Sequence, residues 1–474
     1  MRIQRLTHPL IAGLLCLWIA AASAASDQLP PQVTQALKSA GIPLSSVAVA
    51  VQDLDQDRPS LSLNATLPMN PASTMKLVTT YASLELLGPA YRWQTQALLA
   101  GSLKEGVLEG DLVLKGGGDP HLTLEDFWLL LRGLRARGLK DIRGDLVLDR
   151  TRFGPIEYDA SRFDGDSLRP YNVGADALLL NFKSVRFQFW PDAPAGLVRV
   201  TADPPIVEVS HSLRLGEGAC GEWRDRIKAD FQPQPPAPRA VFSGTYSVSC
   251  GEKDWHVALL APTQYADALF RALWRELGGT LAGSTREGSA PPQARPFGSF
   301  ESPALAEAVR DMNKFSNNVM ARQVFLTIAA EASGTPATNE AAQRAVKAWL
   351  AKKGLEFPEL SIENGSGLSR TDRISAQSLT SLLVSAFRSP SMPELLASLP
   401  LVAVDGTMRR RLKNGAIAGQ AHIKTGSLSD VRAIAGYVLD RNGRRHAVTM
   451  IVNHPNAVRS QAAQDALLNW IYAR

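Results

Sequence analysis

The stretch Asn70-Pro-Ala-Ser-Thr-Met-Lys76 opens an apolar helical pattern that stops at Gly88. Its Asn-Pro start supplies an N-cap and a first helical residue, so Ser73 is expected in the first turn with Lys76 on the same helix face. A neutral amine can deprotonate a neighbouring hydroxyl, provided that burial and a second cation, for which Lys424 is the candidate, depress the pKa of the lysine. On its own, the pair also fits the polar face of an amphipathic helix.

Two later motifs decide between these interpretations. Ser-x-x-Lys occurs once in the chain, and Lys-Thr-Gly occurs once, at Lys424-Thr-Gly426. Ser-x-Asn occurs at Ser62-Leu-Asn64 and at Ser316-Asn-Asn318, but only the second copy lies between the other two motifs. In combination, the three motifs indicate a serine acyl-transfer site that needs no histidine.

The middle motif falls between two helical patterns, where a turn or a helix start would project side chains into a cleft. Ser and Asn are also ordinary N-cap residues, which is the structural alternative. In a catalytic site, Ser316 would relay a proton to the leaving amine, and Asn318 would hydrogen-bond Lys76 and the substrate amide.

The last motif begins an alternating pattern. Lys424-Thr-Gly426 is followed by two predicted hairpin strands, Arg432–Leu439 and His446–Asn453. The glycine leaves room for a peptide to lie against its strand by β-addition. Lys424 and Thr425 would then meet a substrate carboxylate.

The N-terminus is typical of an exported protein. Met1-Arg-Ile-Gln-Arg5 is followed by an apolar run from Leu10 to Ala22 and by Ala22-Ser-Ala24. This pattern predicts a signal peptide over residues 1–24, whereas a membrane anchor would need a longer apolar run. Cys16 follows a leucine where a lipoprotein processing site has a small residue. No later stretch approaches ~20 apolar residues, so the mature chain is expected to be soluble, without a transmembrane segment, and to lie in the periplasm.

Cys220 and Cys250 are the only cysteines that remain after cleavage. An even pair in an oxidising compartment predicts one disulfide, although two separate buried thiols fit the sequence equally until the Cα separation is known. The seven histidines show no ligand spacing, so neither a metal nor another cofactor is expected. Loss of Arg2 and Arg5 lowers the net charge from +6 to +4. This modest charge makes nucleic acid an unexpected partner, and it suits an anionic cell wall or an ordinary soluble surface.

The 240 residues between Lys76 and Ser316 change character along the chain. Gly110–Lys115 and Gly144–Asp149 resemble each other and are predicted strands, with a helix near Leu124–Arg137. Short alternating strands follow, and Pro-bearing breaks lie at 233–238 and 288–296. We expect a discontinuous catalytic domain of residues 25–93 and 297–474, an inserted α/β domain of residues 94–172 and 261–296, and an inserted β-rich domain of residues 173–260.

The motifs together resemble those of the penicillin-recognising serine acyltransferases, which comprise the penicillin-binding proteins and the serine β-lactamases. With the long insertion, Gly116-Gly-Gly-Asp-Pro120, Gly365-Ser-Gly-Leu-Ser-Arg370 and Asp405-Gly-Thr407 are similar to the class C low-molecular-mass penicillin-binding proteins, the D-alanyl-D-alanine carboxypeptidases/endopeptidases. The resemblance covers nearly the whole mature chain. One departure is Glu363-Asn364 before the Gly-Ser-Gly turn, where an Asp or Gly pair is expected, and it bears on loop detail.

The resemblance implies an α/β (α+β) transpeptidase-like domain, an antiparallel sheet flanked by helices, with inserted mixed α/β and β-rich domains. It also implies an enzyme that acts on peptidoglycan peptides and is inhibited by β-lactam antibiotics. Ser73 would attack the carbonyl next to a D-alanine with Lys76 as base, and the backbone N–H groups of Ser73 and Ser427 would form the oxyanion hole. Ser316 would protonate the departing amine. Arg370 is the candidate contact to the acidic stem peptide, although an ordinary surface arginine explains it as well.

Two other functions share part of this evidence. A serine β-lactamase has the three motifs, but it has no use for a 200-residue insertion, and the chain lacks a Glu-x-x-Leu-Asn string. A non-catalytic wall-binding protein on the same scaffold is disfavoured because nucleophile, base, relay and anchor residues are all present. The sequence leaves open the balance of carboxypeptidase and endopeptidase activity, the stem-peptide diamino acid, the role of the inserted domains, the β-lactam affinity and the oligomeric state.

Overall fold

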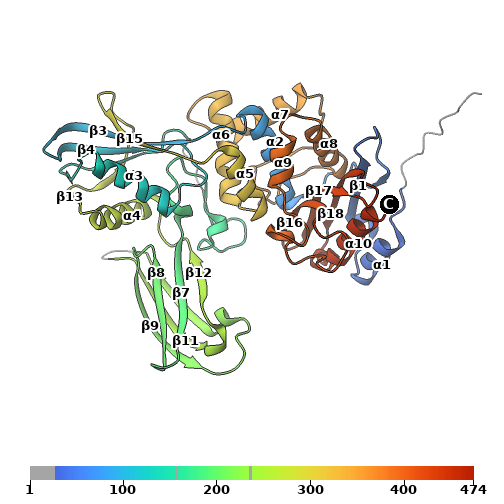
Figure 1. Cartoon of the computed structure of the whole chain (residues 1–474), viewed down its shortest axis with the longest axis horizontal. Helices are drawn as coiled ribbons and strands as arrows, with labels where there is room; N and C mark the ends of the chain where they lie inside the picture. The colour runs from blue at the N-terminus through green and yellow to red at the C-terminus, as the bar shows by residue number, and fades with distance from the viewer. Residues whose placement is uncertain (1–26, 155–157, 234–236) are drawn as a thin grey trace, which may run out of the picture.

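The structure is a computed structural model that describes residues 27–154, 158–233 and 237–474. The predicted signal peptide lies outside the described residues. Within the described ranges, no helix is long and apolar enough to cross a membrane. Figure 1 shows a body that contains both ends of the described chain, joined through α5 and α6 to a second sheet and to a separate group of long strands.

The first body is built on a five-stranded antiparallel sheet with the order β16-β17-β18-β1-β2. Every residue of β1 is buried because helices cover both faces of the sheet. The helices α1 and α10 pack together on one face, and α8 covers the other. The elements are β1 (Val47–Asp53), β2 (Leu61–Leu63), β16 (Ala421–Ser427), β17 (Val431–Leu439), β18 (Arg445–Asn453), α1 (Pro31–Ser39), α8 (Ala376–Phe387) and α10 (Gln461–Tyr472).

A helical layer completes this body and contains its largest apolar cluster. Its members α2 and α6 are buried along most of their length, which their nearly continuous apolar sequence requires. The layer contains α2 (Lys76–Leu86), α5 (Leu305–Lys314), α6 (Asn318–Ser333), α7 (Asn339–Lys352) and α9 (Met392–Ser398).

The start of α2 differs from the sequence prediction. Residues Ala72–Met75 form a 3₁₀ turn, and the α-helix begins only at Lys76. Ala72 has φ +46°, and Asn70 Oδ1 accepts a hydrogen bond from the N–H of Ala72 instead of capping a helix. Ser73 therefore lies on a tight turn in front of the helix.

The second sheet is formed within the long insertion, and its neighbours run in the order β13-β5-β4-β3-β15. The two look-alike segments pair in parallel, since β4 lies beside β6. Strand β15 pairs with β3 as far as Glu301, a few residues beyond the predicted return to the catalytic domain at residue 297. The elements are β3 (Gln94–Lys104), β4 (Val107–Lys115), β5 (Asp141–Ile142), β6 (Leu146–Asp149), β13 (Thr280–Leu281), β14 (Thr285–Glu287), β15 (Arg295–Glu301), α3 (Leu124–Ala136) and α4 (Pro262–Glu276).

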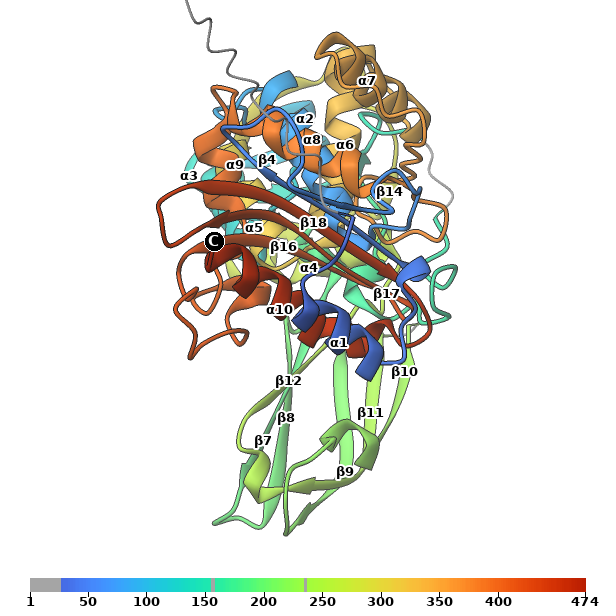
Figure 2. The ribbon, with the colours of Figure 1, turned by 90° about the vertical axis from the view of Figure 1, so that its right-hand side faces the viewer.

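The β-rich part consists of two three-stranded sheets, β12-β7-β8 and β10-β11-β9. Figure 2 shows these strands extending away from the other sheets. Aromatic side chains from both sheets share one apolar cluster with the second sheet and its helices. The strands are β7 (Val185–Asp192), β8 (Leu197–Asp203), β9 (Glu208–Gly216), β10 (Ile227–Gln232), β11 (Arg239–Ser247) and β12 (Lys253–Val257).

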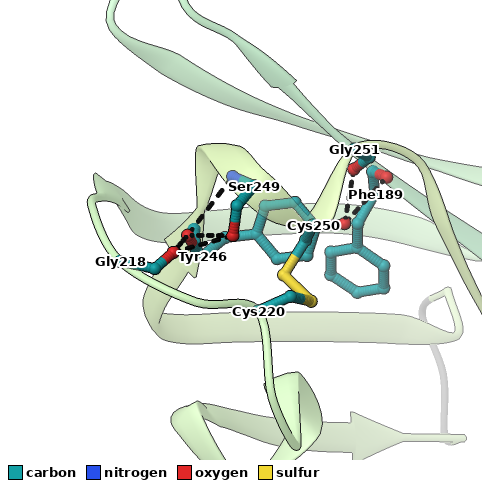
Figure 3. Close-up of a disulfide and its surroundings, with 8 residues drawn as sticks. Phe189, Gly218, Cys220, Tyr246, Ser249, Cys250 and Gly251 are labelled. Carbon is teal, nitrogen blue, oxygen red and sulfur yellow. Dashed lines mark hydrogen bonds between the residues drawn. A yellow bond between two sulfur atoms is a disulfide. The ribbon is translucent and has the colours of Figure 1, made fainter.

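The predicted disulfide is present between Cys220 and Cys250, whose Cα atoms are 4.7 Å apart. Figure 3 shows it beside the rings of Phe189 and Tyr246. The Tyr246 hydroxyl donates to the carbonyl of Gly251 at 2.8 Å, which fixes the turn that holds Cys250. The cross-link therefore anchors the loop before β10 to the end of β11, remote from the three motifs in the sequence.

Candidate active site

The turn that presents Ser73 is held by side chains from both of its sides. The Asn70 amide donates to the carbonyl of Ser369 at 2.9 Å, and the Thr74 hydroxyl donates to the carbonyl of Pro71 at 2.8 Å. The left-handed backbone of Ala72 is uncommon for a residue with a side chain and is found where surrounding structure enforces it. Ser73 is half-buried between neighbours that are buried.

Two glycines pack directly against this turn. A Cβ atom on Gly426 would lie 2.6 Å from the carbonyl oxygen of Pro71 and 3.1 Å from the backbone nitrogen of Ser73. A Cβ atom on Gly367, which has φ +75°, would lie 2.0 Å from the carbonyl oxygen of Ala72. Strand β16 and the Gly-Ser-Gly loop can therefore approach the nucleophile only because both positions lack a side chain.

Lys76 lies beneath Ser73 and is completely buried. Its amino group is 3.0 Å from Ser73 Oγ and 2.7 Å from Asn318 Oδ1, and it also donates to the carbonyl oxygen of Ser366. When Lys76 is neutral, its two N–H groups donate hydrogen bonds to Asn318 and Ser366. The lone pair of the amine then faces the nucleophile. The geometry is that of a general base within hydrogen-bond reach of its proton.

The charge state of Lys76 follows from its surroundings. Burial lowers its pKa well below the usual lysine value, and the nearby charges of Lys424 and Arg322 lower it further. The carboxyl group of Asp372 acts in the opposite direction. These effects favour the unprotonated form of Lys76, which is the form that can accept a proton.

Ser316 and Lys424 form the second half of the cluster. The Lys424 amino group donates to Ser316 Oγ at 2.8 Å and to the carbonyl oxygen of Thr425 at 2.9 Å. Burial lowers the pKa of Lys424 to about 7. Ser316 has φ +55°, a left-handed conformation that turns the chain between α5 and α6. The structure thus brings together all three sequence motifs around one nucleophile.

The remaining predicted residues lie at the edge of this cluster. The Thr425 hydroxyl donates to the hydroxyl of Thr407 at 2.8 Å, and Ser427 is exposed at the end of β16. The Arg370 side chain is half-exposed, ion-paired with Asp430 at 3.1 Å and stacked 4.5 Å from the ring centre of Phe163. The structure links Arg370 to the rim of the site and shows no contact between it and Ser73. Among the described residues, no group of His, Cys, Asp and Glu side chains is arranged to hold a metal ion.

Sequence reasoning missed two buried charges close to the base. Arg322 lies one helical turn after Asn318 on α6, and that spacing was the only sequence signal for it. Asp372 accepts a 2.7 Å hydrogen bond from the N–H of Glu363, while its second oxygen has no hydrogen-bond partner in the described part of the chain. Burial raises the pKa of Asp372 to about 7. Only the fold brings this carboxyl group near Lys76, so no local pattern pointed to it.

The family of the chain follows from comparison with known proteins. The model of the D-Ala-D-Ala carboxypeptidase 3 (S13) family matches residues 29–473, nearly the whole described chain. The chain belongs to this family. It is therefore a serine carboxypeptidase, as the motif resemblance predicted.

Relatives and solved structures agree with this assignment. The chain is 26% identical to the D-alanyl-D-alanine carboxypeptidase DacB of Haemophilus influenzae, over 86% of this chain and 85% of that one. It is 28% identical to a D-alanyl-D-alanine carboxypeptidase of an Actinomadura species, over 84% of this chain and 76% of that one. The crystal structure of penicillin-binding protein 4 from Haemophilus influenzae has the same fold, with a TM-score of 0.78 at 24% identity over 93% of this chain and 99% of that one. A predatory endopeptidase of Bdellovibrio bacteriovorus is a more distant structural match, with a TM-score of 0.51 at 15% identity over 90% of this chain and 92% of that one.

Proposed function

We propose that this chain is a periplasmic, penicillin-sensitive enzyme that removes the terminal D-alanine from peptidoglycan stem peptides and also cleaves their cross-links. The observation that carries the proposal is the buried Lys76 amino group, 3.0 Å from Ser73 Oγ and held by Asn318. The names of the relatives support the D-Ala-D-Ala substrate, and the endopeptidase among the structural neighbours supports the action on cross-links.

Acylation begins when Lys76 takes the hydroxyl proton of Ser73. Ser73 Oγ then forms a bond to the carbonyl carbon next to the terminal D-alanine, and the carbonyl oxygen becomes an oxyanion. The N–H groups of Ser73 and Ser427 are the proposed donors to that oxyanion, since β16 lies directly against the nucleophile turn. A substrate carboxylate would lie near Thr425 and Lys424.

Collapse of the tetrahedral intermediate breaks the C–N bond. The departing amine needs a proton, and Ser316 is the hydroxyl that can supply it, because Lys424 donates to its oxygen and fixes its orientation. The proton that Lys76 acquired replaces the one that Ser316 gives away. Water then attacks the ester, with the neutral Lys76 again available as base, and releases the shortened peptide.

A penicillin fits the same chemistry because its strained amide imitates the D-Ala-D-Ala end. The penicillin-binding protein 4 of Haemophilus influenzae has been determined in complex with a β-lactam, and the Bdellovibrio endopeptidase has been determined acylated by penicillin G. The N-terminal leader pattern supports export to the periplasm, and the disulfide suits an oxidising compartment.

The test is intact-protein mass spectrometry of the purified mature chain after incubation with penicillin, together with D-alanine release from a pentapeptide ending in D-Ala-D-Ala. We expect an adduct of one drug mass and release of D-alanine, both abolished in Ser73→Ala. Ser316→Ala should slow peptide cleavage strongly, whereas Ser62→Ala, in the other Ser-x-Asn string on β2, should not. Rapid loss of the drug without an adduct would indicate a β-lactamase, and an intact drug without an adduct would indicate a binding protein.

A further inference from the structure

A cleft of about 500 Å³ opens beside the active site, between the start of α6 and the inserted domains. Phe315, Ser316 and Asn318 line one wall. Phe182 and Arg186 lie on the opposite wall, which belongs to the insertion. Neither the nucleophile turn nor the Lys-Thr-Gly strand lines this cleft, so it is a space next to the catalytic centre and not the centre itself.

The cleft lies on the side of Ser316 towards which a leaving group can extend. Ser316 Oγ accepts a hydrogen bond from Lys424 and is the proposed proton donor to the departing amine, so that amine must lie within hydrogen-bond distance of Ser316. When a single D-alanine departs, the contact of its amine with Ser316 is almost all that the leaving group needs. When a cross-link is cut, the departing amine belongs to a whole second peptide, which has to continue away from Ser73 past Ser316.

The cleft also exposes side chains that a folded protein normally covers. Phe315 is 72% exposed, the highest value among the exposed large apolar residues in the described chain, and Tyr171 in the same cleft is 40% exposed. Two exposed aromatic rings that share one cleft suit a binding surface.

The backbone of the far wall is strained. Asn181, Phe182 and Lys183 have φ values of 45°, 52° and 54°, three consecutive residues in the left-handed region. L-residues adopt this region singly and at a cost, so a run of three persists only where the surrounding structure enforces it. The Asn181 amide is fixed by the carbonyl of Ser184 and the hydroxyl of Tyr265. This arrangement presents Phe182 to the cleft.

We propose that this cleft binds the leaving peptide of a cross-linked substrate, and this inference rests on the proposed endopeptidase function. Arg186 and Asp203 form an ion pair at 2.6 Å with both side chains partly exposed, and Glu125 and His256 also line the cleft. Such a wall offers partners of both signs to the carboxylates and amines of a stem peptide. Phe315 and Tyr171 offer apolar surface to its backbone and methyl groups.

The experiment compares two substrates of the full mature enzyme. The first is a pentapeptide monomer, which releases D-alanine, and the second is a cross-linked peptide dimer, which releases a peptide. The variants Phe315→Ala and Arg186→Gln should each lower the ratio of kcat/KM for the dimer to kcat/KM for the monomer. For Phe315→Ala the fall should be roughly tenfold, because a bound peptide would bury the Phe315 ring. The monomer normalises for any disturbance of the catalytic centre.

A matched control is Arg199→Gln in the same β-rich part. Arg199 is paired with Asp192 at 2.8 Å and lies outside the cleft, so its substitution should leave the ratio at the wild-type value. A ratio that stays within about twofold of wild type in both cleft variants would overturn the inference. A wild-type enzyme that cleaves the monomer but not the dimer would overturn it too.

If the cleft variants lost as much activity on a glycan-bearing monomer as on the dimer, the occupant would be a sugar and not a peptide. If wild type neither forms the penicillin adduct nor cleaves the monomer, the proposed function itself fails.

Discussion

Gly426→Ala tests the claim that the oxyanion hole depends on a close approach of β16 to the nucleophile turn. The new Cβ atom would lie 2.6 Å from the carbonyl oxygen of Pro71 and 3.1 Å from the backbone nitrogens of Ser73 and Thr74. Non-bonded heavy atoms prefer about 3.5 Å or more, so strand and turn must separate by roughly 0.5–1 Å. The strand can move at its Gly426 end, because β16 is at the sheet edge and the Leu401–His422 bridge on its other side lies nearer its start.

That separation pulls the two proposed oxyanion donors apart. A donor must lie about 2.7–3.1 Å from the oxyanion, and removing one donor lowers kcat by about 10²–10³. We therefore expect acylation by penicillin and cleavage of the pentapeptide to fall by about this factor. The free energy of unfolding should fall only by about 1–3 kcal/mol, as in other cases of local overpacking.

The assay is the rate of penicillin adduct formation, measured with thermal unfolding of the same samples. Gly415→Ala is the matched control, since the nearest atom to its Cβ would be 3.6 Å away, an ordinary contact. An acylation rate within threefold of wild type in a folded Gly426→Ala protein would refute the role given to this approach. If Gly426→Ala fails to fold at the assay temperature, its acylation rate and stability are compared with those of wild type at a lower temperature.

Three further variants test the buried charges and the disulfide. Asp372→Asn removes the negative charge that raises the pKa of Lys76. In a plot of acylation rate against pH, the rising limb should therefore move to lower pH. Because burial raises the folded-state pKa of Asp372 to about 7, wild-type stability should decline as the pH rises from the unfolded-state pKa of about 4 towards 7, and unfolding titrations of the variant should lack that decline. Arg322→Met removes a cation near Lys76 and should move the same limb to higher pH, which a pH series of adduct formation would detect. Replacing Cys220 and Cys250 by serine should lower the free energy of unfolding by about 2–4 kcal/mol in denaturant titrations and leave the acylation rate unchanged.

Patterns that span about a dozen residues predicted individual hairpins and helices of the fold. The hairpin predicted at Arg432–Leu439 and His446–Asn453 is present as β17 and β18, and the helix predicted near Leu124–Arg137 is α3. Alternation and periodicity carry that information within a dozen residues. The position of Lys424 near Lys76 was predictable for a chemical reason, since a lysine that acts as a base needs a second cation to lower its pKa.

The 3₁₀ turn at the nucleophile was not predictable in this way. An Asn-Pro start followed by an apolar run indicates an α-helix, and nothing in those residues signals the left-handed Ala72. The turn is imposed from outside by Gly367 and Gly426, which lie hundreds of residues away in the sequence. Tertiary contacts override the local preference, as they do most often at functional sites.

Helix α6 connects the insertion to the catalytic centre. Helix α6 starts with Asn318, which binds the base, and continues with Arg322 and Gln323, which bind the insertion. The Arg322 guanidinium donates to the carbonyl oxygens of Tyr171 and Val173, and the Gln323 amide donates to that of Asp176 at 2.8 Å. Arg322 thus has two roles, since its charge lowers the pKa of Lys76 while its hydrogen bonds hold the insertion.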